Sequence, residues 1–213
     1  ATSGLGVNKR ELKISSYDVL VNSMLIEKVM IKTEFDNLWV LPSSMNLAGA
    51  ELELVDLEGR EARLRNALAP VKDKYDFIII DCPPSLGLIT INALSAADTL
   101  LVPVQYALEG LSQLMNTIRQ VKRLYNSYLE LEGVLLTMFD GRLNLTQQVV
   151  GEVKRFFPQK VYASVIPRNV RLSEAPSFGQ PVYYYDKSSK GSVAYGEFTK
   201  EFLKKNNRRP KEK

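Results

Sequence analysis

Residues 75–87 read YDFIIIDCPPSLG, and this stretch decides the fold class. The run 76–81 places four large apolar residues between two aspartates, a pattern typical of a β-strand that is covered on both faces. Two prolines follow Cys82, and a central strand cannot continue through proline. We therefore predict that Asp81 lies at the carboxyl end of a buried strand, where open α/β sheets place their ligands.

An aspartate in this position suits the chemistry of nucleotide hydrolysis. A carboxylate at a strand end can hold Mg²⁺, often through water, beside nucleotide phosphates, as a Walker-B residue does. Asp81 is therefore the predicted catalytic and Mg²⁺-binding residue. The alternative is an aspartate that only caps the following turn.

Cys82 follows this aspartate, and two roles are open to it. The chain has no histidine that could activate the thiol. We therefore expect Cys82 to pack as a small residue near the site. The alternative is a reactive thiol, which requires an electropositive and accessible setting.

The rest of the chain alternates short apolar runs with helical periodicity, which favours βα units. The expected strands cover residues 38–42, 76–81, 99–104, 133–138, 161–166 and 182–185. The expected helices cover residues 49–69 with a break at Gly59, 111–129, 144–157 and 192–203. We predict an α/β fold, a mostly parallel, doubly wound sheet flanked by helices, in a single domain over residues 1–203.

Two features of the composition exclude whole classes of catalysis. The 213 residues contain no histidine, which excludes Ser-His-Asp and Cys-His nucleophiles and histidine-bound zinc or iron. The single cysteine excludes CxxC zinc sites and an iron–sulfur cluster held by several cysteines of one chain. Catalysis must therefore use carboxylates, lysine or arginine, backbone amides, or an oxygen-bound metal such as Mg²⁺.

The net charge of +4 is concentrated near the end of the sequence. Residues 204–213, KKNNRRPKEK, contain six basic side chains and one acidic one, so the rest of the chain is slightly negative. We expect this segment to be a disordered basic tail that either contacts a polyanion or only aids solubility. No apolar run approaches the roughly 20 residues that cross a bilayer, and no leader pattern opens the sequence, so a cytoplasmic location is expected.

Four blocks of the sequence resemble the ParA/Soj branch of the ParA/MinD family of ATPases. They read, in order, YDFIIIDCPPSLGLITINAL, ALEGLSQL, GVLLTMFDGRLNL and VIPRNVRLSEAPSFGQPV. The resemblance runs from Ala1 to about Lys204, and the last block points to the chromosome-partitioning branch instead of the MinD branch. It implies a P-loop NTPase-like sheet with ATP or ADP and Mg²⁺ as cofactors in the complete protein.

The sequence departs from the family's pattern in two places. The family's deviant Walker A loop and its aspartate-bearing turn lie upstream of the segment that Ala1 resembles, and no G-x-x-x-x-G-K-[ST] pattern occurs in the chain. We therefore expect that the first strand, loop and helix of the fold are missing, that the chain alone hydrolyses ATP poorly, and that it aggregates through unpaired strand edges. The loop between Gln105 and Ala107 is also about three residues shorter than in the family, and such changes are generally tolerated.

The resemblance also implies where the adenine base binds. The positions that match are Thr137, Met138, Pro167 and Arg168, at the ends of two predicted strands. Stacking on proline and a hydrophobic side chain, with backbone hydrogen bonds, makes an adequate base pocket. The alternative is that Pro167 only ends a strand and Met138 only packs in the core.

In this family the nucleotide-bound dimer binds DNA nonspecifically through basic residues of the C-terminal region. The candidates here are Arg168, Arg171, Lys187 and Lys190, together with residues 204–213. Contacts of this kind are driven by charge and weaken with salt. Ordinary solvated surface lysines are the alternative.

Three functions follow from these observations. The first is an ATP-dependent chromosome or plasmid partitioning ATPase that dimerises around nucleotide, binds double-stranded DNA of the bacterial nucleoid, and works with a ParB-type centromere-binding protein. The second is a non-hydrolysing module that binds DNA or a partner. The third is a MinD-like membrane-surface regulator, in which the final helix would lie in the interface through Phe198, Phe202 and Leu203, flanked by Lys200, Lys204 and Lys205. Membrane binding is not expected, because aromatic residues on one face of a short helix normally pack on a sheet.

Overall fold

The computed structural model describes residues 1–83, 85, 87–105, 109–142 and 144–207. Their contacts group into two compact units. The first unit contains Ala1–Asp98 with Met115–Leu129, and the second contains Thr99–Leu114 with Glu130–Lys213. The expectation of a single domain over residues 1–203 stays a prediction, and each unit is described by itself below.

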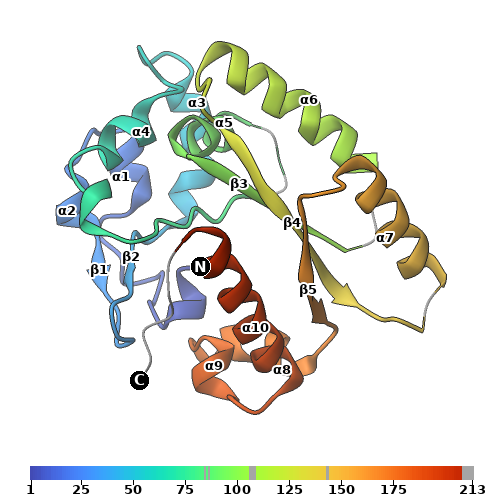
Figure 1. Ribbon diagram of the computed structural model, residues 1–213. Helices are drawn as coiled ribbons and strands as arrows, with labels where there is room; N and C mark the ends of the chain where they lie inside the picture. The colour runs from blue at the N-terminus through green and yellow to red at the C-terminus, as the bar shows by residue number, and fades with distance from the viewer. Residues whose placement is uncertain (84, 86, 106–108, 143, 208–213) are drawn as a thin grey trace. The chain divides into compact units, whose positions relative to one another are not determined.

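A parallel sheet forms the centre of the second unit (Figure 1). Its strands are β3 (Thr99–Val104), β4 (Glu130–Phe139) and β5 (Val161–Pro167), in the order β3-β4-β5. Both neighbouring pairs are parallel. These strands confirm the three expected at 99–104, 133–138 and 161–166.

Helices cover both faces of this sheet, which confirms the predicted P-loop NTPase-like α/β fold. Val134 and Leu136 of β4 pack with Val149 and Val153 of α7 (Asn144–Phe156). The intervening Leu135 packs on the other side, in a cluster that includes residues of α10 (Lys190–Lys205). Successive strand residues point to opposite faces, so this alternation places one helix on each face.

The first unit is mainly helical. Its elements within residues 1–98 are η1 (Ser3–Leu5), α1 (Ser16–Leu20), α2 (Ile26–Val29), β1 (Ile31–Lys32), β2 (Trp39–Val40), η2 (Met45–Ala48), α3 (Ala50–Leu54), α4 (Arg63–Leu68), η3 (Lys72–Lys74) and α5 (Leu88–Ala96). β1 and β2 form an antiparallel pair, so the strand expected at 38–42 is present but short. The helix expected at 49–69 is divided into α3 and α4, and Gly59, with a φ of +61°, lies in the break. A left-handed backbone costs glycine little, which explains the break there.

The long helix α6 (Glu109–Leu124) confirms the one expected at 111–129, with shifted ends. The remaining elements are α8 (Val170–Glu174), η4 (Ala175–Phe178) and α9 (Val182–Tyr185). The last helix, α10, extends through Lys205, so the first two residues of the expected basic tail are helical. Residues 208–213 of that tail, and the loop residues 106–108, lie outside the described residues. No helix within the described ranges is long and apolar enough to cross a bilayer.

The strand expected at 76–81 is wrong. Residues 77–81 follow no regular secondary structure, and the side chain of Ile79 is 87% exposed. A strand forms only where a neighbouring strand accepts and donates its backbone hydrogen bonds. No strand pairing involves this segment in the part of the chain that the structure describes. Ile79 is therefore left in solvent, while Ile80 packs on the core cluster of the first unit.

The strand expected at 182–185 is also wrong, because these residues form the short helix α9. The tyrosine-rich segment has high β-propensity, but that propensity reflects packing beside other strands. Here Tyr185 instead stacks on Phe178 of η4, with ring centroids 5.1 Å apart. Pro181 sits at the N-cap, before the first turn of the helix.

Candidate functional site

Asp81 lies in an exposed loop of the first unit. Its side chain is 68% exposed, and its Oδ2 atom is 2.7 Å from the α-amino nitrogen of Ala1. The carboxylate is therefore accessible to a cation. Mg²⁺ in phosphate-binding sites typically uses one or two protein carboxylates and completes its shell with water and phosphate oxygens. Asp81 fits that requirement.

The described residues offer no closed metal cage beside Asp81. No group of three or more His, Cys, Asp or Glu side chains that could hold a metal occurs among them. A bound Mg²⁺ would depend on this one carboxylate, on water and on a phosphate ligand. Such an ion would supply charge neutralisation at the phosphates.

The neighbouring Cys82 differs from the expectation that it packs as a small residue, because it is exposed. The thiol is partly desolvated by its neighbours, and this, together with the charge of Asp81, raises the pKa of Cys82. A raised pKa lowers the thiolate fraction at neutral pH. The structure thus gives no support to a reactive thiol.

The predicted base-binding residues lie together at the carboxyl ends of β4 and β5. Phe139 pairs with Pro167, and the backbone N–H of Arg168 donates to the carbonyl oxygen of Phe139 at 3.4 Å. This pairing brings the strand end that carries Thr137 and Met138 beside the strand end that carries Pro167 and Arg168. The sequence therefore predicted this grouping correctly, whereas binding of a base there stays a prediction.

Met138 has an unusual backbone for a strand residue. Its φ is +50°, within the left-handed region that residues with a Cβ rarely adopt. The pairing of β4 with β5 is irregular between Leu136 and Phe139, where β4 contains one more residue than β5. Strained backbone of this kind is concentrated at ligand-binding sites. This observation supports the base-binding hypothesis independently of the sequence.

The predictions from the sequence did not include the ion pair at the end of β4. Asp140 follows the strand directly, and both of its carboxylate oxygens accept hydrogen bonds from the Arg142 guanidinium, at 2.9 and 2.7 Å. The hydrogen bonds from the side chain and then the backbone amide of Arg142 hold the pKa of Asp140 at about 2. The signal was available, because Asp140 follows an apolar strand just as Asp81 follows an apolar run.

The predicted DNA-binding residues lie in the second unit, and all four are exposed. Arg171 is engaged by two acids: its guanidinium is 2.7 Å from Glu174 and 3.3 Å from Asp186. The ammonium group of Lys187 lies over the ring of Tyr183, 4.9 Å from its centroid. Arg168 follows β5, and Lys190 begins α10. The geometry thus leaves Arg168, Lys187 and Lys190 without a described salt-bridge partner, while Arg171 is partly neutralised.

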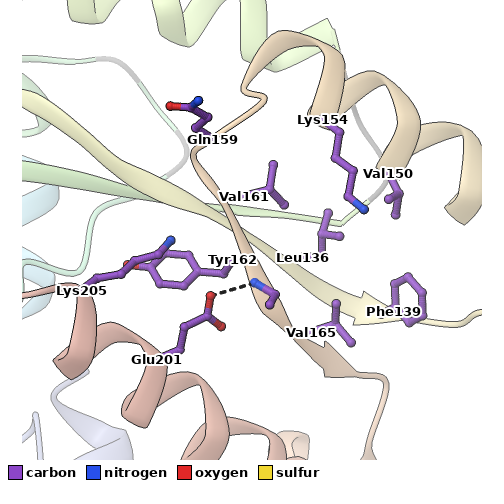
Figure 2. A pocket seen from close by; sticks show the side chains of 11 residues that line it. Leu136, Phe139, Val150, Lys154, Gln159, Val161, Tyr162, Val165, Glu201 and Lys205 are labelled. Carbon is purple, nitrogen blue, oxygen red and sulfur yellow. Dashed lines mark hydrogen bonds between the residues drawn. The ribbon is translucent and has the colours of Figure 1, made fainter.

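A separate pocket of about 510 Å³ lies along β5 (Figure 2). Of the predicted site residues, Lys205, in the basic segment 204–213, lines it, and the predicted Mg²⁺-binding and base-binding residues do not. Glu201 of α10 points to β5 and accepts hydrogen bonds from the backbone amides of Ala163 and Ser164, both at 2.8 Å (Figure 2 shows the first). Partial burial by itself would raise the pKa of Glu201. The hydrogen bonds outweigh this effect and hold the pKa of Glu201 below its usual range.

Phe198 and Phe202 of α10 pack against the sheet. The rings of Phe198 and Tyr162 meet edge to face, with centroids 5.0 Å apart, and Phe202 belongs to the same cluster. An interfacial membrane helix would need these rings on an open face. The packing therefore argues against the MinD-like reading of this helix.

Comparison with known proteins identifies the family. The family model described as AAA domain matches residues 1–131. The chain is 55% identical to sporulation initiation inhibitor protein Soj of Bacillus subtilis over 204 residues, which covers 94% of this chain and 81% of that protein. It is 50% identical to chromosome partitioning protein ParA of Myxococcus xanthus over 208 residues, 96% of this chain and 74% of that one.

The chain belongs to the ParA/Soj family of chromosome-partitioning ATPases. The fold agrees with this assignment. The crystal structure of cobyrinic acid a,c-diamide synthase from Mycobacterium smegmatis, with bound ATP analogue and magnesium, superposes with a TM-score of 0.80 at 33% identity. That match covers 95% of this chain and 77% of the synthase chain. A ParA-type role is thereby supported for this chain.

Proposed function

We propose that this chain is the larger part of an ATP-dependent partitioning ATPase that dimerises around Mg²⁺-nucleotide, binds double-stranded DNA nonspecifically and works with a ParB-type centromere-binding protein. The observation that carries the proposal is the exposed carboxylate of Asp81, just after an apolar run and before two prolines, in a chain of the ParA/Soj family. In this role Asp81 holds Mg²⁺, directly or through water. The nucleoid of the bacterial cytoplasm is the corresponding location.

The strand ends of β4 and β5 serve as the base site in this proposal. Pro167 and Met138 supply apolar surface for the adenine ring, and the backbone around Thr137 and Arg168 supplies hydrogen bonds. The positive φ of Met138 supports this assignment.

The phosphate-binding loop must come from residues outside this sequence. No Walker A pattern occurs in the 213 residues. Glycine-rich loops present backbone amides and lysine to the phosphates, and nothing in the sequence replaces them. The 87% exposure of Ile79, in a segment with the composition of a buried strand, supports the view that residues outside this sequence cover it.

Turnover measurements test this proposal. The present chain should show no Mg²⁺-ATP hydrolysis above background, whereas the chain preceded by a strand and a KGG-x-GK-T loop should hydrolyse ATP. In that longer protein Asp81→Asn should abolish turnover, and Asp73→Asn, an exposed acid elsewhere in the same unit, should leave it unchanged. Hydrolysis by the present chain, or full activity of Asp81→Asn, would contradict the proposal.

DNA binding is tested separately by cosedimentation with duplex DNA. Lys187→Ala with Lys190→Ala should weaken DNA binding. The slope of the logarithm of the binding constant against the logarithm of the salt concentration should become shallower by about one for each lysine that contacts phosphate. Lys28→Ala with Lys32→Ala, exposed in the other unit, is the matched control. Salt-insensitive binding to liposomes without DNA binding would favour the membrane hypothesis instead.

A non-hydrolysing module that binds DNA or a partner is the second candidate. The observation that favours it is the lack of a Walker A pattern in the sequence. DNA binding by the present chain, with no turnover after the loop segment is added, would select this candidate.

A further inference from the structure

The pocket along β5 has no role in the proposed ATPase reaction. Its volume is about 510 Å³, and residues of α7 and α10 line it together with residues of β4 and β5 (Figure 2). All of its lining residues belong to the second unit. Pockets that hold small molecules have volumes of about 300–1,000 Å³. The pocket is therefore large enough for a small ligand.

The side of the pocket next to α7 has an aliphatic floor. Val150 of α7 and Val161 and Val165 of β5 line it, and all three pack against the core cluster that contains Leu136. The three valines are only half-buried, so part of each side chain stays in contact with water. Removal of apolar surface from water favours binding. This floor therefore suits an apolar ligand.

A lysine without an acidic partner stands beside the floor. Val150 and Lys154 are four residues apart, so they share one side of α7. Figure 2 shows Lys154 extending from α7 towards the strands. The next residue, Arg155, lies 3.7 Å from Glu152, whereas no described carboxylate forms a salt bridge with Lys154. Lys154 thus offers a free ammonium group next to apolar surface.

The other charged side chains that line the pocket already have partners. The ammonium group of Lys205 lies over the ring of Tyr162, 3.7 Å from its centroid. Glu201 accepts two backbone amides and the Ser164 hydroxyl, and its lowered pKa keeps it ionised at neutral pH. With Lys154 the lining therefore carries two positive charges and one negative charge, a net charge of +1.

We infer that this pocket binds a small amphiphilic monoanion, an aliphatic chain of about six to ten carbons with one carboxylate. The chain covers Val150, Val161 and Val165, and the carboxylate pairs with Lys154. A single negative charge matches the net charge of the lining. A nucleotide would bring several negative charges towards the ionised Glu201, and an amine would meet two ammonium groups.

An extended peptide fits the same place less well. β5 is the outer strand of the described sheet, and an outer strand can accept a further strand. The amides of Ala163 and Ser164, however, already donate to Glu201. An added strand would have to displace this carboxylate, whereas a small monoanion leaves these hydrogen bonds intact. The inference does not depend on nucleotide binding or on the proposed ATPase activity.

The test is titration calorimetry of the whole chain with octanoate. One molecule per chain should bind, with a Kd of about 1 mM or tighter. Each methylene added from hexanoate to decanoate should tighten binding by about threefold to fourfold, because each one buries further apolar surface. Octylammonium, with the same chain and the opposite charge, should bind about tenfold or more weakly.

Two variants place the ligand in the pocket. Lys154→Gln removes the charge of an exposed side chain and should weaken octanoate binding by about threefold to fivefold. Val150→Thr keeps the shape of the side chain, puts a hydroxyl on the floor, and should weaken binding by about threefold or more. The matched controls are Arg155→Gln, the next position of α7, and Val193→Thr, an exposed valine of α10. Both controls should bind octanoate as the unaltered chain does.

Circular dichroism checks that each variant is folded. Absence of saturable binding, equal losses in the variants and their controls, or equal binding of octylammonium would overturn the inference. An affinity that does not change with chain length would show that the floor contributes nothing, which also overturns it. Displacement of octanoate by Mg²⁺-ATP would assign the pocket to the nucleotide site instead, and the inference would fall.

Discussion

The carboxylate of Glu201 binds Ser164 twice, accepting its backbone N–H at 2.8 Å and its hydroxyl at 2.7 Å. The same carboxylate accepts the amide of Ala163. Two successive amides of a regular strand point in opposite directions, so both can reach one carboxylate only where the strand is irregular. The register of β5 shifts here, because Val134 pairs with Val161 and Leu136 pairs with Val165. Glu201 therefore satisfies the amides that the irregularity removes from the ladder.

Glu201→Ala should destabilise the protein by about 1–3 kcal/mol, because it leaves two backbone amides without their acceptor. Glu201→Gln keeps one carbonyl oxygen and should cost less. Urea unfolding measures both changes. Glu197→Ala, which removes only an exposed pair with Lys200 on the same helix, should change stability by less than about 0.5 kcal/mol. Equal losses at residues 197 and 201 would contradict this account.

The contribution of Glu201 should depend on pH. Its pKa is lowered in the folded protein, so the stabilisation is present above the usual carboxyl range and is lost as pH falls through the folded-state pKa. The difference in unfolding free energy between the unaltered chain and Glu201→Gln should therefore be largest near neutral pH and shrink in acid. A difference that stays constant into acid would show that the carboxylate charge does not matter.

Asp140 should titrate near pH 2, because the Arg142 guanidinium and the Arg142 backbone amide bind its carboxylate. Arg142→Ala should raise the pKa of Asp140 towards the ordinary value of about 3.9 without reaching it, because the backbone amide of residue 142 still donates to the carboxylate. Carboxyl chemical shifts measured by NMR against pH report this directly. Arg155→Ala, which removes an exposed arginine from α7, should leave the Asp140 titration unchanged.

Gly133→Ala should destabilise the sheet. A Cβ at Gly133 would lie 2.5 Å from the ring of Tyr162 and 2.8 Å from the carbonyl oxygen of Lys160. Overpacking of this kind costs about 1–3 kcal/mol. Gly151→Ala, where a Cβ meets no atom within 4 Å in the helix α7, should instead stabilise by about 0.5–1 kcal/mol. Thermal unfolding of both variants distinguishes the two environments, and a stabilising Gly133→Ala would be inconsistent with the close contact.

Asn92 should be essential to the first unit. It is fully buried, accepts the backbone N–H of Leu64 at 3.1 Å, and donates to the carbonyl oxygens of Arg60 and Leu88 at 2.6 and 3.1 Å. Asn92→Ala leaves these backbone groups unpaired and should cost about 2–4 kcal/mol. Asn66→Ala, an exposed asparagine of α4, should cost less than about 0.5 kcal/mol in the same urea titration.

The sequence by itself determined the class of fold and the family. Alternating apolar runs and helical periodicity predicted β3, β4, β5, α6, α7 and α10, and the blocks around Asp81 and Pro167 indicated the ParA/Soj family. The resemblance to the family implied the grouping of Thr137 and Met138 with Pro167 and Arg168, and the structure places these residues at neighbouring strand ends. These features depend on local pattern, which a sequence contains in full.

The tertiary structure decided the rest. Residues 77–81 and 182–185 both have the apolar or aromatic composition of strands, yet neither forms a strand, because a strand exists only through hydrogen bonds to a neighbour far away in the sequence. The left-handed backbone of Met138 and the contact of Glu201 with β5 were equally hidden. A carboxylate on α10 reaches amides about 38 residues earlier only after the helix has packed on the sheet, and no local pattern encodes that distance.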